Sequence, residues 1–226
     1  MKSSYRSRAR ERCFATTPRG LENLLAAELS ELGAAETQPT DGGVAFSGTL
    51  ETLYRCNLGS RIASRLLWRI AAGTYRSEED LYRAARAVDW PRWFDVDRTL
   101  RVNLSAIASP LKSLEFATLR IKDAVCDRFR DRFGRRPSVD TANPDVRIHA
   151  FLTSGDYTLY LDTSGEALFK RGYREGAGEA PLRENLAAGI LRLAGWTPDL
   201  PLLDPMCGSG TFLAEAAQIA LGIAPG

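Results

Sequence analysis

The sequence predicts an α+β N-terminal half followed by the first βα unit of an α/β, Rossmann-like domain. Helical and strand-like segments follow one another without strict alternation up to about residue 165, which is typical of an α+β fold. Two alternating runs, 146–152 and 157–162, flank the turn-forming segment T-S-G-D and predict a β-hairpin. Further on, the apolar run 200–203 leads through a glycine-rich turn into a helix, as in a doubly wound sheet.

Composition excludes several classes of protein. Of the 226 residues, 44% are hydrophobic and 26% are charged, as in an ordinary soluble globular protein. No stretch approaches the roughly 20 apolar residues that span a bilayer. The four cysteines are far apart and His149 is the single histidine, so we expect reduced thiols, no metal site and a cytoplasmic protein. His149 lies in an alternating run, where a strand position is a better explanation than a catalytic role.

Charge is unevenly distributed along the chain. Residues 1–12 carry five basic side chains and one acidic one, although the whole chain has a net charge of only +2. The remainder is therefore slightly acidic and gives no bulk support for nucleic-acid binding. This basic N-terminal arm has no apolar core after it, so it is not a secretory signal. It fits either non-specific attraction to phosphate or a solubilising terminus.

The first folded segment is predicted to be a ferredoxin-like lobe over residues 13–51. A strand at 13–17 precedes a helix at 21–32, in which leucines recur at three- and four-residue spacing. Strands at 35–38 and 44–46 follow around an Asp-Gly-Gly turn. This β-α-β-β order is typical of half of a ferredoxin-like fold.

Residues 52–163 are predicted to form a second α+β domain. Ser77 is expected to cap a helix over 78–88, with Asp80 in its first turn. Trp90, Trp93 and Phe94 are expected in the core. The remaining predicted elements are helices at 50–57 and 113–133 and strands at 65–71, 100–107, 146–152 and 157–162.

The segment that can carry chemistry is D-P-M-C-G-S-G-T, residues 204–211, between the expected strand 200–203 and an expected helix 212–220. Glycines let the backbone approach a ligand, and the following helix points free N–H groups at the loop. A carboxylate at the strand tip suits an ammonium group or ribose hydroxyls. A dinucleotide fingerprint would need glycine where Leu213 stands, and a phosphate loop would need lysine after Gly210.

This motif resembles the first cofactor-binding motif of class I methyltransferases that act on guanine N2 of RNA. Five further segments extend the resemblance over nearly the whole chain after residue 12: F-A-T-T-P-R-G-L-E (14–22), K-D-A (122–124), L-D-T-S-G (161–165), K-R-G-Y-R (170–174) and A-P-L-R-E-N-L-A-A (180–188). Together they resemble the bacterial 23S ribosomal RNA guanine-N2 methyltransferases of the RlmL or RlmKL type. In that family a ferredoxin-like lobe and an RNA-binding THUMP domain precede the methyltransferase domain.

The resemblance implies S-adenosylmethionine as cofactor and 23S ribosomal RNA as partner. It implies that 52–163 is the THUMP domain and that 164–226 holds a linker and the start of the methyltransferase domain. The implied cofactor-binding residues are Asp204, Cys207, Gly208, Ser209, Gly210 and Thr211, with Pro181 and Leu182 before the preceding helix. Lys122, Arg171 and Arg174 are candidate RNA contacts; for Arg171 and Arg174, at the interdomain junction, interdomain pairing is equally possible.

One family motif is missing from the sequence. The N-P-P-Y-type tetrapeptide that holds the target guanine does not follow residue 211, so no catalytic residue is assigned and we expect a truncated chain with little activity alone. An alternative is a non-catalytic RNA-binding module. The basic residues of helix 113–133 alternate with acids, and pairs such as Asp127 with Arg130 favour a solvated helix face over an RNA contact.

Overall fold

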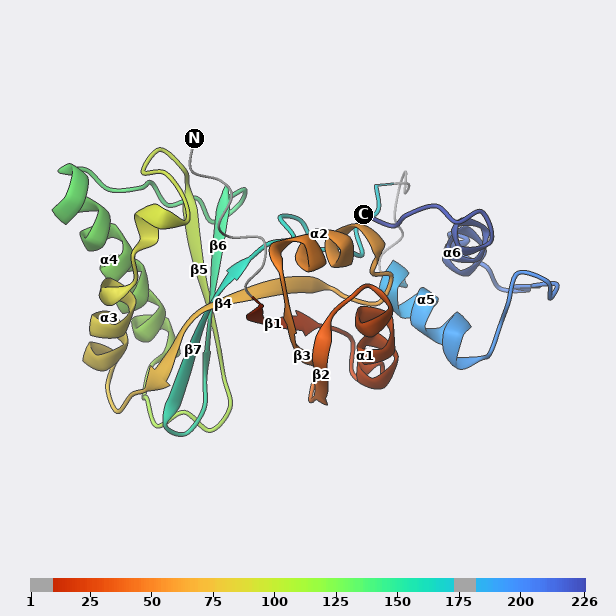
Figure 1. Cartoon of the computed structure of the whole chain (residues 1–226), viewed down its shortest axis with the longest axis horizontal. Coiled ribbons are helices and arrows are strands. Elements are labelled where there is room, and N and C mark those ends of the chain that lie inside the picture. Colours follow the sequence, from red (N-terminus) through yellow and green to blue (C-terminus); the bar gives the residue numbers. More distant parts are fainter. Residues whose placement is uncertain (1–9, 173–181) are drawn as a thin grey trace. The chain divides into compact units, whose positions relative to one another are not determined.

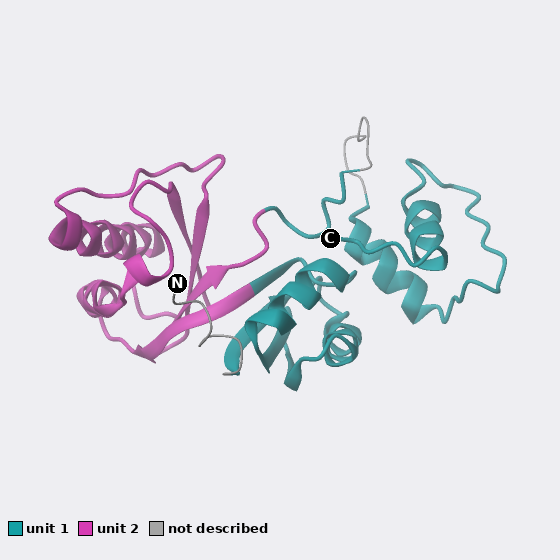
Figure 2. Cartoon of the chain, turned by 45° about the horizontal axis from the view of Figure 1, so that its top comes forward, with its two compact units in different colours: residues 1–66, 166–226 teal, residues 67–165 magenta. Residues whose placement is uncertain are grey.

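The computed structural model describes residues 10–172 and 182–226 and divides into two compact units. Unit 1 comprises residues 1–66 and 166–226, and unit 2 comprises residues 67–165 (Figure 2). Unit 1 is therefore built from both ends of the chain. Unit 2 is a single continuous segment between them.

The N-terminal part of unit 1 has the predicted β-α-β-β order. Its elements are β1 (Glu11–Thr16), α1 (Glu22–Glu31), β2 (Ala35–Thr40) and β3 (Gly43–Gly48) (Figure 1). Strand β3 is central and pairs antiparallel with both β1 and β2. On α1 the leucines Leu25 and Leu29 are completely buried, as their spacing predicted.

Helix α2 (Leu50–Gly59) belongs to unit 1, whereas we expected the second domain to begin at residue 52. The Thr49 hydroxyl caps the helix by accepting a bond from the Thr52 N–H, and Leu53 and Cys56 are buried. Burial raises the pKa of the Cys56 thiol to about 12. The apolar face of α2 thus packs within the N-terminal lobe.

Unit 2 is a four-stranded sheet with two helices on one side (Figure 1). The strand order is β4-β7-β6-β5, with β5 and β6 parallel and the other pairs antiparallel. The predicted hairpin is confirmed, since Leu152 pairs with Tyr157 and the Thr153 N–H donates to the Asp156 carbonyl at 2.8 Å. Its elements are β4 (Arg65–Thr74), α3 (Glu78–Ala87), the 3-10 turn η1 (Trp90–Arg92), β5 (Leu100–Ala106), α4 (Leu114–Phe133), β6 (Val146–Leu152) and β7 (Asp156–Asp162).

The core of unit 2 lies between the helices and the sheet. Ser77 caps α3 as predicted, and Asp80 returns a bond to the Ser77 N–H. Trp90 is completely buried, and its indole N–H donates to the Ala85 carbonyl at 2.7 Å. Phe94 packs on Phe129 of α4. The predicted core position is confirmed for Trp90 and Phe94, whereas Trp93 is half-buried and packs on Trp68.

The C-terminal part of unit 1 contains α5 (Glu184–Leu193) and α6 (Thr211–Ala220) but not the strand predicted at 200–203. That prediction is wrong for this chain, because a parallel strand needs neighbours for its backbone bonds and no described strand pairs with this segment. Leu203 is consequently 86% exposed and Met206 90% exposed. Helix α5 approaches α1 closely at Gly189, where a Cβ would lie 2.5 Å from Leu21 Cδ1.

Neither a metal-ligand cluster nor a membrane-spanning helix occurs among the described residues. Within residues 10–172 and 182–226, no three His, Cys, Asp or Glu side chains gather as a metal-ligand set. Among the helices of the same residues, none combines the length and apolar character needed to cross a membrane. The four cysteines are free, with Cys207 exposed.

Candidate functional site

The glycine loop of residues 204–211 leads directly into α6. Gly208 has φ 53° and Gly210 has φ 71°, in the left-handed region that favours glycine. Gly210 is also the N-cap of α6, and no side chain caps the helix there. A Cβ added at either glycine would meet nothing within 4 Å. The loop therefore needs glycine for its backbone conformation, and it places the N-terminus of α6 at the turn.

Polar side chains surround this opening. One carboxylate oxygen of Asp204 accepts a bond from the Met206 N–H at 3.2 Å, which fixes the start of the turn. The Ser209 and Thr211 hydroxyls lie 3.3 Å apart, and Thr211 is buried under the first helical turn. Cys207 is exposed at the turn. A carboxylate, hydroxyls and a helix N-terminus fit a ligand that carries an amino-acid group and a ribose.

Of the two interpretations of Arg171, ion pairing rather than phosphate contact holds in this structure. Its side chain is 2% exposed, and its Nε lies 2.7 Å from a Glu215 carboxylate oxygen on α6. Arg61, which follows α2, lies 3.5 Å from the other Glu215 oxygen. Burial lowers the pKa of Arg61, and the Glu215 carboxylate opposes that effect. Glu215 was missed from the sequence, although it is the only charged residue of α6 and that isolation was the available signal.

The other expected site residues are placed differently. Lys122 on α4 is partly exposed, lies 2.9 Å from Asp123 and lines a cavity together with Arg136 and Ser138. Leu182 is half-buried just before α5. Arg174 and Pro181 lie outside the described residues.

The basic face of α4 is largely occupied by carboxylates. The expected local pair of Asp127 with Arg130 is confirmed at 2.7 Å. Longer-range pairs join Arg120 to Glu79, Arg132 to Asp89 and Arg135 to Asp97. These exposed pairs contribute little stability each, but they neutralise much of the charge that could attract RNA. This outcome agrees with the solvated-face interpretation.

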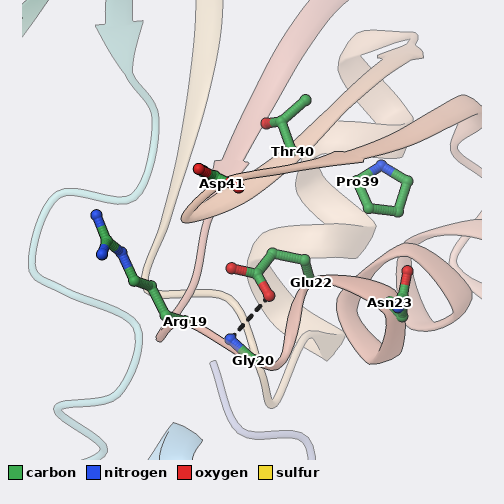
Figure 3. A pocket seen from close by; sticks show the side chains of 7 residues that line it. All are labelled: Arg19, Gly20, Glu22, Asn23, Pro39, Thr40 and Asp41. Atoms are coloured by element: carbon green, nitrogen blue, oxygen red, sulfur yellow. Dashed lines mark hydrogen bonds between the residues drawn. The ribbon is translucent and has the colours of Figure 1, made fainter. Parts of the chain in front are cut away.

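A separate open pocket of about 460 Å³ lies at the turns of the N-terminal lobe (Figure 3). Its lining residues are Arg19, Gly20, Glu22, Asn23, Pro39, Thr40 and Asp41. Glu22 accepts a bond from the Gly20 N–H at 2.8 Å, and its second oxygen accepts from the Gly42 N–H at 3.0 Å. The carboxylate thus joins the β1–α1 turn to the β2–β3 turn. We assign it a structural role.

Glu22 makes the stability of the lobe depend on pH. Burial alone would raise the pKa of Glu22, but backbone N–H groups, including those of Gly42 and Gly20, and the charge of Arg19 lower it overall. Because the pKa of Glu22 is lower in the folded state, its charge stabilises the fold at pH values above the unfolded-state pKa of about 4.3. This stabilisation disappears as the pH falls through the folded-state pKa. We expect Glu22→Gln to lower the free energy of unfolding at pH 7 by about 1 kcal/mol.

Urea titrations at pH 7 and pH 2.5 measure this effect. The difference between wild type and Glu22→Gln should shrink at the lower pH, as the Glu22 carboxylate takes up a proton. Glu31→Gln, at an exposed position of the same helix, is the matched control. An equal loss at both pH values would contradict the role of the carboxylate charge.

Three domain families match the chain in succession. The RlmL ferredoxin-like domain matches residues 12–67, the THUMP domain matches 75–162, and the RMKL-like methyltransferase domain matches 171–226. The chain is therefore similar, in this order, to a ferredoxin-like domain, a THUMP domain and a methyltransferase domain.

Individual relatives agree with this composition. The "Putative RNA methyltransferase slr0064" of Synechocystis is 46% identical over 213 residues, which cover 94% of this chain and 56% of that protein. The crystal structure of SMU.472, "a putative methyltransferase complexed with SAH", is 34% identical with a TM-score of 0.84 and covers 96% of this chain and 57% of that one. A "predicted N6-adenine-specific DNA methylase" from Listeria monocytogenes is 31% identical with a TM-score of 0.85, at 96% and 57% coverage. The chain spans a little over half the length of these relatives.

Proposed function

We propose that this chain supplies the RNA-binding domains and the cofactor loop of a methyltransferase that transfers a methyl group from S-adenosylmethionine to RNA. The observation that carries the proposal is the glycine loop, with Gly208 and Gly210 both at positive φ directly before α6. The match to the RMKL-like methyltransferase domain and the SAH-bound relative support it. SAH is the product that S-adenosylmethionine leaves after it donates its methyl group.

The loop residues have separate roles in this proposal. Asp204 accepts hydrogen bonds from the cofactor, and the glycines allow the backbone to approach it. The Ser209 and Thr211 hydroxyls and the Cys207 backbone complete the wall, with Pro181 and Leu182 covering the cofactor. The sulfonium group supplies an electrophilic methyl when the cofactor is bound, so the contribution of the protein is chiefly alignment.

We further propose that the target is the N2 amine of a guanine in 23S ribosomal RNA, in the cytoplasm. The motifs shared with bacterial guanine-N2 methyltransferases and the RNA methyltransferase relative support this choice. The THUMP domain is the RNA-binding element, with Lys122 beside Arg136 and, from the linker, Arg174 as contact candidates.

Methylation by a protein that carries this chain and a complete methyltransferase domain tests the proposal. With labelled S-adenosylmethionine and 23S RNA, we expect N2-methylguanosine after nuclease digestion. Methyl transfer to adenine N6 of DNA, the activity in the name of the Listeria relative, would overturn it.

Asp204→Asn tests the loop in the same protein. A lost bond to a charged acceptor costs about 1.5 kcal/mol or more, so calorimetry should show at least about tenfold weaker binding of S-adenosylmethionine. Asp199→Asn is the control, since this carboxylate lies close in sequence but outside the motif. Equal affinities of wild type and Asp204→Asn would exclude the carboxylate from the site.

The alternative is an RNA-binding module without chemistry, and the exposed segment around Leu203 and Met206 favours it for residues 1–226 alone. Without strand neighbours, nothing in the described structure holds the start of the loop in a sheet. Calorimetry on this chain should then show no binding of S-adenosylmethionine, while RNA binding persists and weakens with salt. Micromolar affinity for the cofactor would exclude this alternative.

A further inference from the structure

A buried ion cluster joins α6 to the N-terminal lobe within unit 1. The Glu215 side chain is 0% exposed and faces two guanidinium groups, Arg171 at 2.7 Å and Arg61 at 3.5 Å. These residues come from three separate parts of the sequence: the segment after α2, the linker before α5, and α6 itself. The cluster therefore connects the ferredoxin-like lobe with the helix that carries the glycine loop.

Further N–H groups of the two arginines donate to backbone carbonyls on both sides. Arg171 donates to the Leu168 carbonyl at 3.1 Å and to the Arg61 carbonyl at 2.9 Å. Arg61 donates to the Gln218 carbonyl at 3.3 Å and to the Ile223 carbonyl. Helix α6 is thus held at its middle through Glu215 and at its C-terminal end through these carbonyls. Such directional bonds restrict both the translation of α6 along its axis and its rotation about that axis.

The lobe side of the cluster is also fixed. Glu28 of α1 accepts bonds from the Arg61 N–H at 3.1 Å and from the Ile62 N–H at 3.2 Å. On the other side, Glu215 lies about one helical turn after Thr211, the first residue of α6. A short helix moves as a rigid unit, so the position of Glu215 determines the position of the glycine loop. Continuous contacts thus run from α1 to the loop.

We propose that Glu215, held by Arg171 and Arg61, is a positioning residue that orients the cofactor loop against the ferredoxin-like lobe. This inference rests on the proposed function, because it assigns the loop to a cofactor. Apolar side chains of similar volume often stabilise a buried site as well as an ion cluster does. The expected contribution of the cluster is therefore the orientation of the loop, and a test must separate orientation from stability.

Hydrogen exchange followed by mass spectrometry measures loop orientation without any cofactor. We expect Glu215→Gln to raise native-state hydrogen exchange of the backbone amides 204–214 by about tenfold. The NH2 group of the glutamine side chain would face the guanidinium donors, cannot accept their hydrogen bonds, and so would no longer hold the helix. Arg171→Lys, which keeps the charge, should have a smaller effect. Lys170→Gln is the matched control, since the neighbouring Lys170 forms an exposed pair with Glu166 at 3.2 Å. Amides of α4 in unit 2 should be unchanged in every variant.

Cofactor affinity provides the second readout, in the protein with the complete methyltransferase domain. Glu215→Gln should raise the Kd for S-adenosylmethionine about tenfold, with RNA affinity unchanged. If the wild type does not bind the cofactor, the proposed function fails, and the exchange measurement still decides whether Glu215 holds the loop. The two failures are thereby distinguishable.

A triple variant covers the case in which Glu215→Gln does not fold. Arg61→Met/Arg171→Met/Glu215→Met removes all three charges and keeps apolar volume in the site. We expect it to fold with wild-type stability but with rapid exchange at 204–214 and weak cofactor binding. Wild-type exchange and affinity in either folded variant would overturn the proposal and leave the cluster a purely structural element.

Discussion

Trp90→Ala is expected to lower the free energy of unfolding of unit 2 by about 4 kcal/mol. Trp90 is one of the largest completely buried side chains, and its removal leaves a cavity that surrounding residues such as Phe94 cannot fill. It also leaves the Ala85 carbonyl without the indole donor. Urea unfolding measures this loss of stability, with hydrogen exchange of peptides from β5, β6 and β7 as the readout.

Two variants define the origin of this effect. Trp90→Phe keeps most of the apolar volume and should cost only about 1 to 2 kcal/mol, chiefly through the lost hydrogen bond. Ile107→Ala removes a large side chain from the same unit at an exposed position and should change stability little. A cost for Trp90→Ala no larger than that for Ile107→Ala would contradict the buried position of Trp90.

Glu28→Ala is expected to destabilise unit 1 by about 3 kcal/mol, because it leaves several buried donors without an acceptor. The Glu28 carboxylate accepts from the Ser60 hydroxyl at 2.6 Å and from the Arg61 and Ile62 N–H groups. The Arg192 guanidinium on α5 lies 3.6 Å from it. Urea unfolding measures this loss of stability, with hydrogen exchange of peptides from β1 to β3 as the readout.

Glu31→Ala is the control for this experiment. Glu31 lies on the same helix, one turn later, but is exposed. Its replacement should alter stability by less than about 0.5 kcal/mol. Similar losses in the two variants would mean that helix propensity, and not the buried carboxylate, determines the effect.

Local signals predicted most of the fold. The helix after Ser77 was found because a capping residue precedes a periodic apolar pattern, and both features depend only on neighbouring residues. The hairpin between β6 and β7 was found for the same reason, since T-S-G-D separates two alternating runs. Strand order and the parallel pairing of β5 with β6 depend on distant segments, and the sequence analysis did not predict them.

Non-local contacts account for the errors. The run 200–203 has the composition of a buried parallel strand, but a strand forms only where partners supply its hydrogen bonds. For Arg171 the sequence left phosphate contact and interdomain pairing open, because either suits a basic residue at a domain junction. Its burial depends on Glu215, 44 residues away, so no local pattern reveals it. The glycine loop was found because the positive φ of Gly208 and Gly210 restricts residue type.

The division of the chain into units has a consequence for synthesis. Strand β4 enters unit 2 where β7 leaves it, and Leu67 pairs with Asp162. Unit 2 is thus an insertion whose two ends adjoin, and all of it has been translated once residue 165 has been added. The surrounding unit must wait for residues 166–226 to acquire α5 and α6. The inserted unit is therefore translated in full before α5 and α6, which belong to the unit that contains the N-terminal lobe.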